Sequence, residues 1–184
     1  MKFTIFFAGL LGILLTPALA DYNIDITDNK NTAESEQQSV SVNREHNVAN
    51  IDNNNGLDSW NAIWDFNTGY AAVRVFHKKA CIVHRMNKGV MPSLQALDEM
   101  VKKNKLQGEG PGGPPPKSLI YSLNSEKVEN LDKFGKPIVG MCKGVATYMA
   151  EEIQGATFAF ALSLCFSTSI LELNISFCGG ISGK

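Results

Sequence analysis

Apolar, β-branched and aromatic residues are densest in two neighbouring runs, at residues 70–76 and 80–86. A short polar turn, His-Lys-Lys at residues 77–79, separates the runs. Two such runs joined by a polar turn are typical of a β-hairpin. The sequence therefore predicts a hairpin whose second strand contains Cys81.

The apolar spacing changes to a helical period over residues 91–107. The apolar side chains that share one helix face are Leu94, Leu97, Met100 and Val101. Ser93 can cap the start of this helix, and Gly108 is a plausible stop. Three lysines in its second half complement the negative end of the helix dipole. We expect a helix over this range.

The second half of the chain alternates short elements. Residues 108–117 hold four glycines and four prolines, so this segment predicts a loop. Beyond the loop we expect a strand at 119–123, a second helix between 124 and 135, a short helix at 137–143 and a strand at 145–153.

The segment 153–184 is strongly apolar and strand-prone. Residues 155–171 carry no charge, so a membrane helix has to be considered. These residues are rich in serine and threonine and fall short of the roughly 20 mainly apolar residues that a spanning helix needs. We therefore expect a buried strand pair within 157–178 and no stable membrane span.

The two ends of the chain differ from its centre. Residues 1–20 combine an early lysine, an apolar run and a final Ala-Leu-Ala, which is the pattern of a cleaved secretory signal peptide. Residues 21–53 are rich in asparagine and acidic residues and poor in large apolar ones. Such a composition predicts a flexible, solvated acidic arm. The chain as a whole has a net charge of −1, and we expect no nucleic-acid partner.

The chain contains four cysteines, all beyond the predicted signal peptide. In a secreted protein they predict two disulfides, for which three connectivities are possible. Cys81 and His84 have a metal-like spacing, but a strand would direct the two side chains to opposite faces. We therefore predict no metal and no cofactor. The chain also lacks G-x-S-x-G and H-E-x-x-H motifs and a P-loop, so we predict that it is not an enzyme.

Two further residues are candidate sites. Asp65 stands between Trp64 and Phe66, where its carboxyl is either buried and neutral or ionised and held by a partner. The partner would be a set of backbone N–H groups, Arg74 or Arg85. Asn174 begins the sequence Asn-Ile-Ser, an acceptor for N-glycosylation, although it lies inside a predicted strand.

The spacing of three residues resembles a known family. Asp65 is followed sixteen positions later by Cys81, and Cys142 comes about sixty positions after that, which is similar to the signature pattern of the BRICHOS domain. Segments such as CIVH, QGEGPGGPPPK and TYMAEE extend the resemblance over nearly the whole chain, to the gastric mucosal members of that family.

The resemblance implies a fold and a set of sites. The fold is α+β, a small, mainly antiparallel sheet of about five strands with a helix on each face, stapled by disulfides and occupying residues 54–152. Asp65 would be the signature acid and Cys81–Cys142 the signature disulfide. Cys165 and Cys178 then remain as a second pair.

The resemblance also implies a non-enzymatic secreted protein of the gastric mucosa that promotes epithelial growth, protection and repair. Its partner would be an epithelial cell-surface molecule or a mucus component. The alternative is an extracellular chaperone that binds β-prone segments and suppresses amyloid formation.

Overall fold

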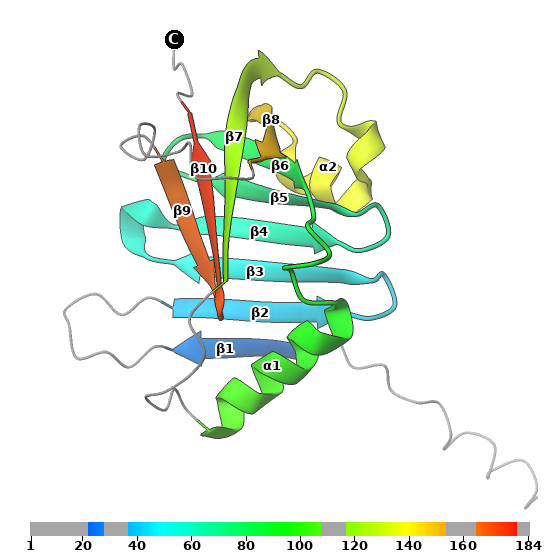
Figure 1. Ribbon diagram of the computed structural model, residues 1–184, viewed down its shortest axis with the longest axis vertical. Coiled ribbons are helices and arrows are strands. Elements are labelled where there is room, and N and C mark those ends of the chain that lie inside the picture. The colour runs from blue at the N-terminus through cyan, green and yellow to red at the C-terminus, as the bar shows by residue number, and fades with distance from the viewer. Residues whose placement is uncertain (1–21, 28–36, 108–116, 154–164, 180–184) are drawn as a thin grey trace, which may run out of the picture.

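The computed structural model describes residues 22–27, 37–107, 117–153 and 165–179. The predicted signal peptide lies outside these ranges. Within them, one ten-stranded sheet runs in the order β1-β2-β3-β4-β5-β6-β8-β7-β10-β9 (Figure 1). The strands are β1 (Tyr22–Thr27), β2 (Gln37–Asn43), β3 (Val48–Asn54), β4 (Trp60–Asp65), β5 (Tyr70–Val75), β6 (Ala80–Arg85), β7 (Lys117–Lys127), β8 (Ala146–Glu152), β9 (Cys165–Ile170) and β10 (Leu173–Cys178).

The sheet is mixed. Strands β1 to β6 form an antiparallel meander, each strand pairing with the next along the chain. The β6–β8 and β7–β10 pairs are parallel, whereas β7–β8 and β9–β10 are antiparallel. In Figure 1, β7, β10 and β9 cross in front of the meander, so the sheet curls over itself. Gln38 of β2 accordingly donates a hydrogen bond to the Ser169 carbonyl of β9, over 2.8 Å.

Two helices pack on opposite faces of the sheet. Helix α1 (Leu94–Gln107) contributes Leu97 and Val101 to the larger apolar core. Helix α2 (Lys136–Cys142) contributes Ile138 to the smaller one. The neighbouring β5 residues Ala72 and Val73 belong to the smaller and the larger core respectively, as the period of two in a strand requires.

The predicted fold class is wrong, because the sheet has ten strands instead of about five and is a mixed, curled sheet. Seven of its nine strand pairs are antiparallel, and the other two are parallel. The extra strands come from both flanks of the predicted domain. At the carboxyl end, β9 and β10 pair with each other and β10 also pairs with β7. The segment 165–178 is therefore part of the same sheet.

The prediction of a flexible arm at 21–53 is also wrong for the described residues, which form β1, β2 and most of β3. The polar composition of this segment suggested disorder, but its apolar residues recur at every second position. Val40, Val42, Ala49 and Ile51 alternate with polar residues and are at most 2% exposed. One apolar face per strand is enough to bury these strands in the larger core.

The expected second helix at 124–135 is wrong as well. β7 continues to Lys127, and only a 3-10 turn, η2 (Asp132–Phe134), follows it. Another 3-10 turn, η1 (Gly56–Asp58), joins β3 to β4. None of the helices in the described ranges is long and apolar enough to cross a membrane.

Candidate functional site

Asp65 ends β4 and organises the turn into β5. Its side chain is buried, at 3% exposure, and its Oδ1 accepts hydrogen bonds from the backbone N–H groups of Asn67 (2.9 Å) and Thr68 (3.2 Å). A carboxylate at this position is a common turn-forming device, because its oxygen replaces a backbone acceptor. Of the partners considered from the sequence, backbone N–H groups are the ones that Asp65 has.

The two arginines considered for Asp65 lie elsewhere. Arg74 donates to the Met141 carbonyl over 2.8 Å. The Arg85 guanidinium lies over the Tyr70 ring, 5.2 Å from its centroid. Each arginine is therefore engaged with a group other than Asp65.

The Asp65 turn packs closely against the start of α2. Thr68 donates its hydroxyl to the Phe134 carbonyl, over 3.3 Å. Gly135 has φ +92°, and a Cβ placed on it would lie 2.5 Å from Asp65 Oδ2. A residue with a side chain would therefore be strained by its backbone and would collide with Asp65. This close approach joins Asp65 to the segment that carries Cys142.

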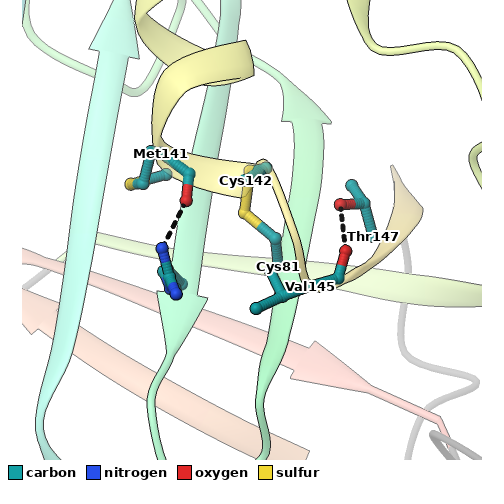
Figure 2. The surroundings of a disulfide bond; sticks show 6 residues. Cys81, Met141, Cys142, Val145 and Thr147 are labelled. Atoms are coloured by element: carbon teal, nitrogen blue, oxygen red, sulfur yellow. Dashed lines mark hydrogen bonds between the residues drawn. A yellow bond between two sulfur atoms is a disulfide. The ribbon is translucent and has the colours of Figure 1, made fainter.

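The Cys81–Cys142 disulfide joins β6 to the end of α2 (Figure 2). Both cysteines are fully buried, with 5.5 Å between their Cα atoms. Around them lies the smaller apolar core, to which Ala72, Val83 and Phe134 also belong. Cys81 is therefore not available as a metal ligand or nucleophile while this bond is intact.

A groove of about 470 Å³ opens beside Asp65. It is lined by Asn43, His46, Val48, Asp65, Asn67, Lys136 and Pro137. Both asparagines of this lining are already engaged, since Asn43 accepts from the His46 N–H and Asn67 donates to the His46 carbonyl. The remaining ionisable groups are one carboxyl, one ammonium and one imidazole, which can hold a polar group but do not form a nucleophile–base pair.

The second disulfide, Cys165–Cys178, links the directly opposed ends of β9 and β10, with 4.1 Å between the Cα atoms. The resemblance implied the Cys81–Cys142 pair and left Cys165 and Cys178 as the second pair, which is the pairing that the structure has. On the outward face of the same hairpin, Ser167 bonds to Ser176 over 2.9 Å and Ser169 donates to Asn174 Oδ1 over 2.7 Å. Asn174, the predicted glycosylation acceptor, is thus on a polar face of a strand, half-buried.

A site that the sequence reasoning missed lies around His84, which is completely buried. Its ring is 4.3 Å from the Tyr121 ring and 5.3 Å from the Phe177 ring, between centroids. Nδ1 contacts the Arg85 carbonyl at 3.0 Å, a geometry that requires Nδ1–H to donate. Nε2 has no partner among the described residues. His84 shares its strand parity with the buried Ile82, and this was the signal in the sequence that could have predicted its burial.

Burial lowers the pKa of His84 to about 4, although the hydrogen bond to the Arg85 carbonyl works in the opposite direction. Burial also raises the pKa of the Tyr121 phenol, and the nearby Glu152 carboxylate adds to that effect. The Tyr121 hydroxyl donates to the same Arg85 carbonyl, over 3.1 Å. At neutral pH this aromatic cluster is therefore uncharged.

Comparison with known proteins gives a consistent result. The family model described as BRICHOS domain matches residues 56–149. The chain is 64% identical over 180 residues to gastrokine-1 of Homo sapiens, covering 97% of each chain. It is 68% identical over 183 residues to gastrokine-1 of Sus scrofa, covering 99% of each. Gastrokine-1 of Mus musculus is 55% identical over 181 residues, with 97% of each chain covered. No solved structure matches the chain.

Proposed function

Because the chain belongs to the gastrokine family of BRICHOS-domain proteins, we propose that it is a secreted, non-enzymatic protein of the gastric mucosa that binds β-prone segments. The binding place is the free edge of β9. The observation that carries this proposal is the position of β9 as the last strand of the sheet: within the described ranges it pairs with β10 alone.

The edge of β9 offers backbone groups to an incoming strand. In an antiparallel pair, alternate residues direct both their N–H and their C=O away from the partner strand. The Ser169 carbonyl accepts its hydrogen bond from the Gln38 side chain, which places Ser169 among these outward residues. Ser167, two residues earlier, has the same orientation and is exposed. An extended peptide could bond here and continue the sheet, as in other cases of strand addition.

The structure also supplies a rigid support for this edge. β9 is tied to β10 by the Cys165–Cys178 disulfide, and β10 pairs along its whole length with β7. Thr168 and Ile170, on the inner face of β9, are buried at 1% exposure. The strand is therefore held in an extended form before a peptide arrives, which lowers the entropy cost of binding.

Substitution of Ser167 tests the proposal. Ser167→Pro removes one outward N–H at an edge position, where proline is tolerated. Ser167→Ala is the matched control, because it loses the same hydroxyl but keeps the N–H. We expect the alanine variant and the unaltered protein to slow fibril growth of an amyloid-forming peptide, followed by thioflavin fluorescence, and the proline variant to have lost most of this effect. Equal suppression by both variants, with unchanged circular dichroism, would rule out the β9 edge.

The second candidate function is promotion of epithelial growth, protection and repair, through an epithelial cell-surface or mucus partner. It is favoured by the extent of the similarity to gastrokine-1, which covers 97–99% of the chain, well outside residues 56–149. The proline variant separates the two functions. Stimulation of gastric epithelial cells by Ser167→Pro at the level of the unaltered protein would assign the growth effect to another surface, and its loss would assign both to β9.

A further inference from the structure

Two exposed apolar side chains are carried by neighbouring turns at one end of the sheet. Among the described residues, the large hydrophobic side chains that are exposed are Leu57, at 85%, and Phe76, at 47%. The Phe76 N–H donates to the Ser59 carbonyl, two residues beyond Leu57, over 3.4 Å. The η1 turn and the β5–β6 turn are therefore neighbours at one end of the sheet, and each carries one of the two exposed apolar side chains.

Basic residues follow Phe76 directly in the β5–β6 turn. His77, Lys78 and Lys79 form the exposed turn that follows Phe76. Lys78 Nζ lies 5.6 Å from the centroid of the Phe166 ring, and the Arg74 guanidinium lies 5.9 Å from that of Phe76. We call Leu57, Phe76, His77, Lys78 and Lys79 the basic apolar end.

The charge of this end is positive. Neither Lys78 nor Lys79 makes an ion pair with a carboxylate of the described residues. Asp58 is the acidic residue of the adjoining η1 turn, so it offsets one of the two lysines and leaves one positive charge. A partner that complements this end has to be anionic and apolar at the same time.

We propose that the basic apolar end docks on an anionic lipid surface. Leu57 and Phe76 enter the boundary between the headgroups and the acyl chains, and the two lysines contact lipid phosphates or carboxylates. The exposure of Leu57 favours a lipid surface over an anionic polysaccharide as the partner. A side chain that is 85% exposed gains from hydrocarbon, whereas a sulfated sugar chain would pair with the lysines and leave it in water.

This docking is peripheral, and it is a separate activity from the binding of β-prone segments by the β9 edge. The charged turn and η1 lie on the loops that close the β3–β4 and β5–β6 hairpins, and neither strand pair has to open. An attached molecule would remain folded, with its helices and its disulfides unchanged.

Vesicle co-sedimentation of the full secreted chain tests the proposal. The probes are phosphatidylcholine vesicles with and without phosphatidylserine. We expect binding to the anionic vesicles that weakens with added salt. Leu57→Ser with Phe76→Ser should abolish most of it. Lys78→Gln with Lys79→Asn should weaken it about 25-fold, at about five-fold per lysine; asparagine tolerates the positive φ of 47° at position 79.

A matched control removes two lysines elsewhere. Lys88 and Lys136 are exposed and lie at the opposite end of the sheet, after the end of β6 and beside Asp65, so Lys88→Gln with Lys136→Gln should change vesicle binding less than two-fold. Absence of binding to the anionic vesicles would overturn the proposal. Binding that is unaffected by loss of Leu57 and Phe76 would overturn it too, and retention on heparin through the two lysines without vesicle binding would assign the end to an anionic polysaccharide instead.

Discussion

The Asp98 carboxylate on α1 forms an ion pair with the guanidinium of Arg44, which lies in the turn between β2 and β3. The same oxygen of Asp98 is 3.1 Å from Lys102 Nζ, one helical turn later. The Asp98 side chain is 2% exposed, and its Oδ1 has no partner among the described residues. The contact with Arg44 attaches α1 to the β2–β3 hairpin. A segment that was predicted to be a flexible arm therefore stabilises the position of a helix.

Loss of the Arg44 side chain should therefore destabilise the fold. We expect Arg44→Met to reduce the free energy of unfolding by about 1–3 kcal/mol, because a buried carboxylate loses one of its two cations. Urea unfolding followed by tryptophan fluorescence measures this value. Lys103→Met is the matched control on the exposed side of α1, and it should change stability by less than about 0.5 kcal/mol. Equal effects of the two substitutions would mean that the ion pair contributes nothing.

The two disulfides should differ in their contribution to stability. Cys81 and Cys142 are 61 residues apart, and Cys165 and Cys178 are 13 apart. On the chain-entropy model, these loops correspond to about 4 and about 3 kcal/mol. Replacing both cysteines of the first pair by alanine should thus lower the free energy of unfolding and the secreted yield more than replacing both cysteines of the second pair. Non-reducing peptide mapping tests the pairing itself, and a peptide joining Cys81 to Cys165 would contradict it.

His84 should make the fold sensitive to acid. Its pKa is about 4 in the folded protein and about 6.5 when exposed, so the unfolded chain takes up the proton first as the pH falls. The neutral ring contributes about 3 kcal/mol to the free energy of unfolding above pH 6.5. This contribution declines as the pH falls from about 6.5 to 4, and it is absent below that range. No carboxylate is in direct contact with the ring among the described residues.

His84→Leu should remove this component of the pH dependence. The free energy of unfolding, measured between pH 7 and pH 4, should fall less steeply for this variant than for the unaltered protein. His77→Gln removes an exposed histidine and is the control, with the slope unchanged. An identical slope for His84→Leu and the unaltered protein would show that other groups cause the acid sensitivity.

Gly135 should tolerate no side chain. Its φ of +92° and the 2.5 Å approach to Asp65 Oδ2 predict that Gly135→Ala destabilises the fold by about 2–4 kcal/mol, through backbone strain and displacement of the Asp65 turn. Gly140 is the control within α2. A Cβ there meets no atom within 4 Å, so Gly140→Ala should be neutral or stabilise the helix by up to about 1 kcal/mol. Thermal melting of both variants is sufficient, and similar melting temperatures would contradict the prediction.

The parts of the fold that the sequence predicted well are those with a strong local period. The hairpin expected at 70–76 and 80–86 corresponds to β5 and β6, and the helix expected at 91–107 corresponds to α1. In each, neighbouring residues determine which side chains are buried. The short helix that carries Cys142 is also local, because Gly135 and Pro137 set its start.

The parts that it predicted poorly depend on distant partners. Val40 and Ile51 are isolated apolar residues in a polar segment. They are buried because the curled sheet places them in the larger core. Val128, Leu131 and Phe134 have helical spacing, yet the chain before them stays extended to Lys127 through its pairing with β8, and only the η2 turn follows. The groove beside Asp65 combines three segments that are distant in the chain, and no local pattern marks it.

For a chain that is secreted as we propose, the strand order also determines the order in which the strands can pair as the chain emerges from its N-terminus. Strands β1 to β6 are neighbours in both sequence and sheet, so each can pair as soon as the next has emerged. β7 precedes β8 in the chain but borders β6 only through it, and Cys81 emerges 61 residues before Cys142. During that interval β6 is an open edge beside an unpaired thiol. This nascent stage is therefore where a protein disulfide isomerase or a holding chaperone would have most to protect.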